Sequence, residues 1–432
     1  MTPLAPRPPR NPTPDAVRLT RTILDSEAQP NALGRRWPRT PDRPSERSER
    51  DAVAGRQAGA VAGAVAVLGS NTNSVSASDT LSVRAGRAKL YALRRYLWPI
   101  SAKRVAKCGR CAIEDVGIGM RGGRARFTGL MRCGSVWACP VCSAAIRAER
   151  AAEIGQLYRW QLERGGEILM LTVTVAHGMG DDLRTVRQGV ANAWRTVQQG
   201  RAWKELRSLY WLSGYVRALE VTHGRNGWHP HLHILLCLDK PLSDRARELM
   251  RRSLSARWQL AVSRVLGAQH RPNDGNGCNL RPAHEAEYIA KLGLEVADVH
   301  TKGAKRGNRT PWQIAAEYQA GNRNYGVLWQ AYARGMLGAR MLTWSRGLRV
   351  ACGLVPELTD EEIVNAEDAE PTERVMLLPA VVWRELRDGP AWLLLDAAET
   401  GSRDVLLAEV ERHLGMARNR PREGIRRLFL SG

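Results

Sequence analysis

Three histidines alternate with other residues in the segment WHPHLHILL, residues 228–236. Successive side chains of a β-strand point to opposite faces, so His229, His231 and His233 share one face of a strand here, opposite Leu232. Imidazoles are common metal ligands, and an apolar opposite face would attach this strand to a core. A purely structural role would need a hydrogen-bond partner for each ring. The pattern therefore predicts a metal site.

A carboxylate on the preceding strand can complete this site. Residues 213–222 also read as a strand, and the Asn-Gly pair that follows is typical of a β-hairpin turn. If residues 223–228 form the loop, Glu220 lies opposite His231 on the same face. With His233, these side chains give two nitrogens and an oxygen, which suit Mg²⁺ or Mn²⁺ and also bind Zn²⁺ in vitro. A one-residue slip would turn Glu220 away. The alternative role for Glu220 is that of a strand-face carboxylate paired with one of the many arginines.

Five of the eight cysteines lie close together in the sequence. Cys108-Gly-Arg-Cys111 and Cys139-Pro-Val-Cys142 are two CxxC pairs separated by 27 residues. Two such pairs can surround one Zn²⁺ as a tetrahedron of thiolates, so these four cysteines are predicted to hold a structural zinc ion. Cys133 lies between the pairs; it either replaces one of the four or is a small buried residue. A redox role would require a thioredoxin-like βαβ context, which the sequence lacks.

One tyrosine has a neighbourhood suited to nucleophilic chemistry. In the segment EAEYIAK, helical spacing places Glu285, Tyr288 and Lys291 on one face. A phenol beside an ammonium group is stabilised as phenolate, which is a nucleophile. The alternative is packing, the ordinary role of most of the nine tyrosines.

Periodicity and turn residues predict the elements that must position these groups. The expected order mixes strands and helices, so the predicted fold class is α+β. Strands are expected at 168–175, 213–222 and 229–238; helices at 143–163, 181–210, 242–266, 284–293, 311–319 and 326–335; and loops at 270–281 and 301–311.

Composition shifts along the chain predict five regions. Ten of the 22 prolines lie in the first 44 residues, and eight carboxylates against one arginine mark residues 357–374. The predicted regions are a disordered tail (1–85), a Cys-rich zinc-binding segment with a lead-in helix (86–150), a central domain with the histidine strand and the tyrosine helix (151–350), an acidic linker (351–374) and a small C-terminal region of unknown role (375–432).

Charge and motifs limit the classes of function. The 65 Lys and Arg against 43 Asp and Glu give a net charge of +22, which excludes an acidic buffer and favours nucleic acid over an anionic membrane as partner. Arginine dominates the basic residues, as GC-rich coding would also produce. No GxxxxGK[ST] loop is present, which disfavours an ATP-driven motor. The sequence contains no apolar stretch near the roughly 18 residues of a membrane span and no apolar signal-peptide start, so a cytoplasmic protein without membrane partners is expected.

Taken together, these motifs resemble the HUH endonucleases, in particular the rolling-circle replication initiator (Rep) proteins of actinobacterial and Gram-positive plasmids. The resemblance covers about residues 105–350. It rests on LTVTVAH at 171–177, His231-Leu232-His233, Tyr288 with Lys291, CGSVWACPVC at 133–142, RTPWQI at 309–314 and LTWSRGLR at 342–349.

This resemblance implies an HUH nuclease core whose central antiparallel sheet carries the histidine strand, with helices on one face. It also implies a catalytic divalent ion, Mg²⁺ or Mn²⁺, held by His231, His233 and Glu220. Tyr288, assisted by Lys291 and Glu285, would attack one DNA strand to give a 5′-phosphotyrosine and a free 3′-OH. The implied partners are plasmid origin DNA, as a single strand or hairpin, and a host helicase and DNA polymerase. The basic segments 301–310 and 418–427 would contact the DNA backbone.

One position departs from the family pattern. Some relatives carry a glutamate four residues before the tyrosine, where it activates water to end a replication round; here that position is His284, with Glu285 and Glu287 alongside. Three alternatives stay open: an HUH transposase or relaxase, a non-enzymatic zinc-containing nucleic-acid-binding protein, and a metallohydrolase for a small substrate. Relaxases usually place the tyrosine before the histidine motif, which is not the order here.

Overall fold

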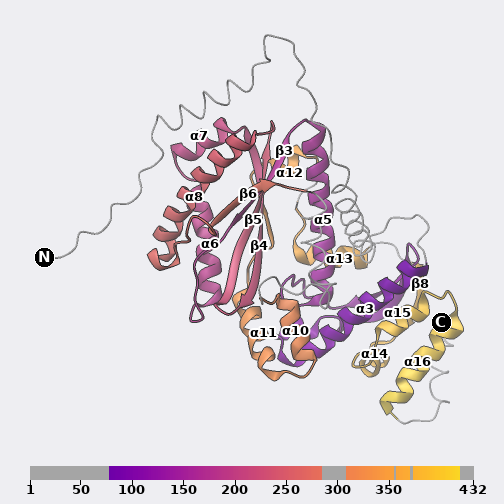
Figure 1. The fold of residues 1–432 in the computed structure, drawn as a ribbon. Coiled ribbons are helices and arrows are strands. Elements are labelled where there is room, and N and C mark those ends of the chain that lie inside the picture. Colours follow the sequence, from indigo (N-terminus) through magenta and orange to yellow (C-terminus); the bar gives the residue numbers. More distant parts are fainter. Residues whose placement is uncertain (1–76, 285–307, 355–356, 370–372, 419–432) are drawn as a thin grey trace, which may run out of the picture.

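The computed structural model describes residues 77–284, 308–354, 357–369 and 373–418. These residues form two antiparallel sheets with helices packed around them (Figure 1). The larger sheet has five strands in the order β6-β3-β5-β4-β7, and the smaller has three in the order β2-β1-β8. The α+β class predicted from the sequence is confirmed.

The larger sheet places the histidine strand at its centre. Its strands are β3 (Glu167–Val173), β4 (Leu212–Gly224), β5 (Gly227–Leu238), β6 (Cys278–Pro282) and β7 (Leu342–Trp344). The histidine strand β5 lies between β3 and β4, as the sequence predicted.

The register of the β4–β5 hairpin is the one assumed from the sequence. Glu220 lies opposite His231, and Thr222 lies opposite His229. Pairing continues two residues further than expected, to Gly224 and Gly227, so only residues 225–226 form the turn. Gly227 has a φ of 84°, which glycine adopts at little cost. The tighter turn lengthens both strands without moving the metal-binding face.

Helices cover both faces of the larger sheet (Figure 1). On one face, Leu232 and Ile234 pack in a core with side chains of α6, α7 and α8. On the other, Leu235 and Cys237 pack in a second core with side chains of α5, α10 and α11. These helices are α6 (Leu183–Val197), α7 (Arg201–Leu209), α8 (Asp244–Leu266), α5 (Pro140–Glu163), α10 (Pro311–Gln319) and α11 (Arg323–Gly335). The expectation of helices on one face is wrong, because β5 carries apolar side chains on both faces.

The smaller sheet joins distant parts of the chain. β1 (Ala112–Arg121) and β2 (Arg124–Leu130) form a hairpin in the Cys-rich segment, and β8 (Glu373–Leu378) pairs with β1. Helices α14 (Ala380–Leu386), α15 (Trp392–Ala398) and α16 (Arg403–Arg418) share a third core with this sheet. The described part of the predicted C-terminal region, 375–418, is therefore built onto the Cys-rich segment.

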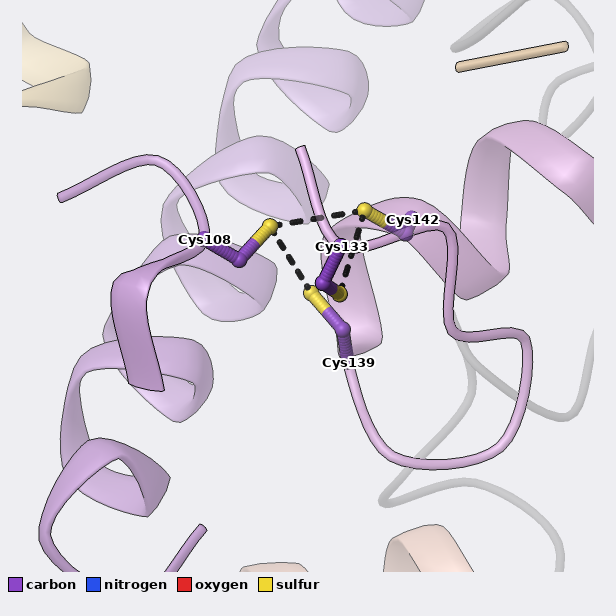
Figure 2. Close-up of side chains that lie close together, drawn as sticks. All are labelled: Cys108, Cys133, Cys139 and Cys142. Carbon is purple, nitrogen blue, oxygen red and sulfur yellow. Dashed lines mark hydrogen bonds between the residues drawn. The ribbon is translucent and has the colours of Figure 1, made fainter. Parts of the chain in front are cut away.

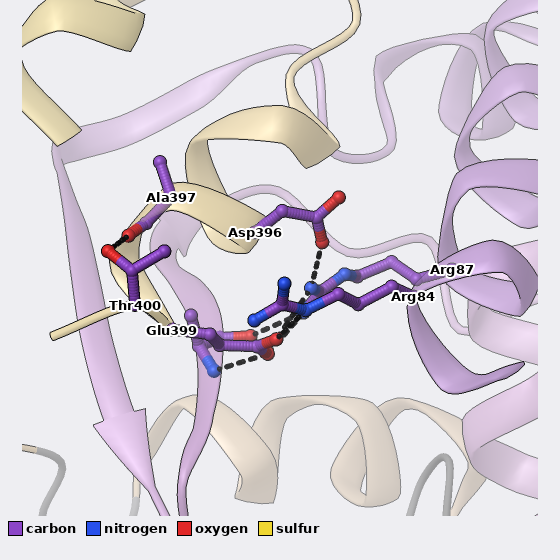
Figure 3. A network of polar contacts seen from close by, with 7 residues as sticks. Arg84, Arg87, Asp396, Ala397, Glu399 and Thr400 are labelled. Atoms are coloured by element: carbon purple, nitrogen blue, oxygen red, sulfur yellow. Dashed lines mark hydrogen bonds and ion pairs between the residues drawn. The ribbon is translucent and has the colours of Figure 1, made fainter. Parts of the chain in front are cut away.

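Helix α3 (Ala77–Leu97) runs past the smaller sheet and is tied to α15 by ion pairs (Figure 3). Arg87 pairs with Glu399 at 2.6 Å and also with Asp396, while Arg84 reaches Glu399 at 3.2 Å. The backbone N–H of Ala125 in β2 donates to Glu399 at 3.0 Å. One carboxylate therefore joins α3, α15 and β2.

The remaining elements are short. They are the 3₁₀ helices Trp98–Ile100 and Ala268–His270, α4 (Lys103–Lys107), α12 (Leu348–Ala351) and α13 (Asp360–Ala369). Helix α13 lies in the predicted acidic linker, yet its Ile363 and Val364 are buried in the main core. The predicted loop at 270–281 contains the start of β6, and the predicted helix at 284–293 lies, apart from His284, outside the described residues. None of the described helices is long and apolar enough to cross a membrane.

Candidate functional site

Three side chains predicted as metal ligands meet on the β4–β5 hairpin. The Oε2 atom of Glu220 lies 2.6 Å from Nε2 of His233 and 3.2 Å from Nε2 of His231. One ligand atom from each residue lies within 4.8 Å of the other two. The register explains this geometry, because Glu220 faces His231 directly and His233 diagonally across the strand pair.

Neighbouring groups orient both imidazoles toward the carboxylate. The Oγ1 of Thr172 on β3 lies 2.9 Å from Nδ1 of His233, and the backbone carbonyl of His229 lies 3.2 Å from Nδ1 of His231. A carbonyl only accepts hydrogen bonds, so the neutral His231 ring carries its proton on Nδ1. Its Nε2 lone pair then faces Glu220, which is the state required of a metal ligand.

Electrostatics keep the carboxylate charged and leave one side of the group accessible. Burial alone would raise the pKa of Glu220, but while no ion is bound, the charge of protonated His231 and the hydrogen bonds that His231 and His233 donate lower this pKa well below its usual value. The Glu220 side chain is 24% exposed, whereas the two imidazoles are 11% and 10% exposed. This group offers three ligand atoms and keeps access to solvent, so it can hold a metal ion with a position open for a further ligand.

His229, the third histidine of the strand, contacts His177 instead of joining the group of Glu220, His231 and His233. Nδ1 of His229 lies 2.7 Å from Nε2 of His177, and their ring centres are 4.7 Å apart. Burial, with the neighbouring His231 and His177, lowers the pKa of His229 to about 3, so this ring is neutral. His177 follows β3 and also contacts the carbonyl of Asn226 in the hairpin turn at 2.9 Å. The sequence identified His177 only as the end of a motif and gave no indication of this pairing.

The predicted tyrosine site falls outside the described residues. This applies to Glu285, Tyr288 and Lys291, and also to Glu287. The departure from the family pattern, His284, is the last described residue before them and is exposed.

Four thiols meet in a second group, buried where the Cys-rich segment packs on α5 (Figure 2). Cys108 lies 3.5 Å from Cys142 and 3.6 Å from Cys139, and Cys133 lies 3.7 Å from Cys142, all between sulfur atoms. A tetrahedral ion with bonds of about 2.3 Å separates its ligand sulfurs by about 3.8 Å. The spacing of these thiols therefore fits a single four-coordinate metal ion.

Cys133 occupies the place that the spacing had assigned to Cys111. The β1–β2 hairpin brings Met131 beside the first CxxC turn: its backbone carbonyl accepts from Gly109 at 2.7 Å, and its N–H donates to Cys111 at 2.9 Å. Cys133, two residues later, is thereby carried to Cys108, while Cys111 is half-buried outside the group. Cys108, Cys139 and Cys142, which belong to the two CxxC pairs, lie in the group.

The surroundings favour a thiolate at Cys108, whereas hydrogen bonds with the other thiols and burial raise the pKa of Cys139. Hydrogen bonds from Cys133, Cys139 and Cys142, together with the nearby Arg94, lower the pKa of Cys108 well below its usual value. Cys139 and Cys142 lie at the N-terminal end of α5, where the helix dipole favours negative charge. The group is part of the main core, so a metal ion held there would brace α5 against the segment that carries β1 and β2.

Comparison with known proteins shows that the hairpin group lies in a segment that matches a protein-family model. Residues 128–273 match the family model described as "Replication protein". This segment contains Glu220, His231 and His233, together with three of the four clustered cysteines.

Three curated proteins are similar to parts of the chain. A "Protein rep" of Streptomyces lividans is 29% identical over 57% of this chain and 69% of its own length. A "Neomycin resistance protein" of Streptomyces cyanogenus is 32% identical over 26% of this chain and 32% of its own, and a "Protein rep" of Lentilactobacillus hilgardii is 28% identical over 48% and 65%. No solved structure gives a significant match. These matches confirm the resemblance to plasmid replication initiators.

Proposed function

We propose that this chain, with its replication-protein segment at residues 128–273, starts plasmid replication by nicking one strand of origin DNA. The observation that carries this proposal is the convergence of Glu220, His231 and His233 on an accessible side of the central hairpin. Two imidazoles and a carboxylate suit Mg²⁺ or Mn²⁺, the ions that phosphoryl transfer commonly uses.

The chain's own residues prepare this centre. Thr172 and the His229 carbonyl fix the two imidazole rings, so their Nε2 atoms already face Glu220 before an ion arrives. The ionised Glu220 adds a negative charge that attracts a cation. When bound, a divalent ion would polarise the scissile phosphate and stabilise the charge that develops on its oxygens.

The proposed nucleophile is Tyr288. Its phenolate oxygen would attack the scissile phosphorus in line as the bond from phosphorus to the 3′ oxygen breaks, giving a 5′-phosphotyrosine and a free 3′-OH. Lys291 would stabilise the phenolate, and Glu285, on the same helical face by sequence, is a candidate acceptor for the phenol proton. The phosphodiester energy is kept in the new bond, so later joining needs no ATP. The 3′-OH would prime a host polymerase, with a host helicase unwinding the duplex.

The thiol group is proposed to hold a structural zinc ion through Cys108, Cys133, Cys139 and Cys142. Four soft sulfur ligands favour Zn²⁺ and leave no coordination position for a substrate. Its place in the main core supports a role in holding the fold together.

A covalent-adduct assay tests the nicking proposal. Single-stranded oligonucleotides that tile the DNA around the gene are incubated with the protein and Mn²⁺ or Mg²⁺, then separated on a denaturing gel. The expected result is an adduct on one oligonucleotide that disappears in Tyr288→Phe and in His231→Ala. Tyr318→Phe is a matched control, because it removes a phenol hydroxyl on α10 and should leave the adduct intact.

Other outcomes would replace the proposal. Cleavage that persists in Tyr288→Phe moves the nucleophile to another group. DNA binding without cleavage of any tiled oligonucleotide favours a non-enzymatic zinc-containing DNA-binding protein.

A further inference from the structure

A recess beside the tip of the β4–β5 hairpin has no role in the chemistry described above. It has a volume of about 630 Å³, within the range of small-molecule sites. Three separate segments line it: the hairpin tip, the residues before α10 and the first turns of α11. The lining residues are His223, Gly224, Arg225, Arg309, Asn322, Asn324, Tyr325 and Leu328.

The lining combines an aromatic ring with positive charge. The Arg309 guanidinium carbon lies 5.3 Å from the centre of the Tyr325 ring, and Arg225 lies exposed at the hairpin turn. Glu317 lies 4.0 Å from the Arg309 guanidinium, at the outer limit of an ion pair. Aromatic rings with nearby arginines are the usual means of binding unpaired bases together with their phosphates. The exposed amide of Asn324 adds a hydrogen-bonding group suited to a base edge.

Backbone contacts fix the recess to the metal-binding hairpin. The N–H of His223 donates to the Arg309 carbonyl at 2.9 Å, and the N–H of Arg309 donates to the His223 carbonyl at 2.7 Å. His223 is three residues from Glu220 on β4, which is about 10 Å along a strand, and this odd spacing points the two side chains to opposite faces of the hairpin. A stacked single strand advances about 3.4 Å per nucleotide, so a strand that passes from the recess round the hairpin to Glu220 would span at least about three nucleotides.

We propose that this recess binds a nucleotide of single-stranded DNA close to the cleaved bond, with its base against Tyr325 and its phosphate beside Arg309 and Arg225. The assignment of the strand's path rests on the proposed nicking function. The recess would hold the strand in register while its scissile phosphate lies at Glu220, His231 and His233. Because stacking is tolerant of sequence, the recess should also bind unpaired DNA that lacks the origin sequence.

Fluorescence anisotropy with the full-length protein tests this proposal. The probe is a fluorescein-labelled oligothymidylate of about 12 nucleotides, used without added divalent metal. Tyr325→Leu is expected to weaken binding about tenfold, whereas Tyr325→Phe, which keeps the ring, should bind within about twofold of wild type. Arg309→Ala should weaken binding and lower the slope of log affinity against log salt by about 0.7.

A matched control separates a specific contact from loss of charge. Arg164 also lies over an aromatic ring, 4.4 Å from the centre of Trp160, and pairs with Asp239 just past the end of β5 remote from the hairpin turn. Arg164→Ala should leave the affinity for the oligothymidylate nearly unchanged. Thermal unfolding of each variant checks that the fold is intact.

The outcomes separate the recess from the nicking proposal. If folded Tyr325→Leu and Arg309→Ala bind like wild type, or if Arg164→Ala is equally weakened, the recess assignment is wrong, whatever the adduct assay gives. If the Tyr325 and Arg309 variants lose affinity but wild type forms no adduct on any tiled oligonucleotide, the recess assignment stands and the nicking proposal fails.

Discussion

The two candidate metal-binding groups of this protein differ in the solvent exposure of their ligands. The thiol group is closed: Cys108 and Cys139 are fully buried, and Cys133 and Cys142 are 2% exposed. The hairpin group is open, since the Glu220 side chain is 24% exposed. Four ligands complete a tetrahedron, whereas three leave a position for a substrate oxygen. Burial and ligand count therefore suit the thiol group to the proposed structural ion and the hairpin group to the proposed reactive ion.

The groups also differ in how the chain assembles them. The thiols come from three segments: the turn before β1 with Cys108, the stretch after β2 with Cys133, and the start of α5 with Cys139 and Cys142. The hairpin ligands come from two strands joined by one turn, so their geometry depends on local register alone. Damage to the thiol group should therefore weaken the fold, and damage to the hairpin group should weaken chemistry while the fold survives.

The largest expected effect comes from removing a thiol of the closed group. Cys133→Ser should lose most of the bound zinc and unfold at a much lower temperature, because zinc binding and folding are coupled at such sites. Cys111→Ser should keep about one zinc per chain and unfold near the wild-type temperature, since Cys111 lies outside the group. Zinc content by mass spectrometry and thermal unfolding by circular dichroism measure both. The opposite ranking would restore Cys111 as the ligand.

The open group should respond in activity rather than in stability. His233→Ala removes a ligand and is expected to lower the rate of adduct formation by about 10³-fold, with little change in unfolding temperature. His229→Ala keeps the backbone carbonyl that orients His231, so we expect a loss of less than about tenfold. Single-turnover rates at saturating Mn²⁺ measure both variants. Equal losses would make His229 a ligand and would refute the assignment based on Glu220, His231 and His233.

The ion pairs of Glu399 with Arg87 and Arg84 involve no metal, so their loss should lower stability less than loss of the thiol group. They provide a reference for comparison with both metal-binding groups. Glu399→Gln removes the charge that Arg87 and Arg84 contact, and should lower the free energy of unfolding by about 2 to 3 kcal/mol. Glu205→Gln is the matched control: Glu205 pairs with Arg201 at 2.7 Å on the exposed surface, where such pairs contribute about 0 to 1 kcal/mol. Denaturant unfolding measures both variants. If the two substitutions lower the free energy of unfolding by similar amounts, the buried cluster does not stabilise the fold.

The same cluster gives a pH dependence. Burial opposes ionisation of Glu399, but Arg87 and the N–H of Ala125 hold its pKa below the usual value of 4.5. The unfolded chain therefore binds the proton more tightly than the folded chain. The stabilisation is complete at neutral pH and is lost as pH falls from the ordinary pKa through the folded one. Glu399→Gln should show a weaker fall in stability over this acidic range than wild type.

The sequence by itself determined the hairpin group. Alternation along the histidine strand and the Asn-Gly turn placed His231, His233 and Glu220 on one face, and the structure has the same register. Period-two alternation and a short turn are local properties, so no distant contact was needed. The α+β class and the central place of the strand were also predicted. The resemblance to replication initiators came from the order of the motifs.

Only the tertiary structure decided which thiols meet and what else covers the sheet. CxxC spacing favoured Cys111, but the β1–β2 hairpin brings Cys133 to the group instead. The pairing of β8 with β1 joins residues about 250 positions apart, and no local pattern encodes such a contact. The recess at Tyr325 and Arg309 likewise depends on distant segments. Local periodicity determines register, whereas contacts between remote segments depend on how complete elements pack into a core.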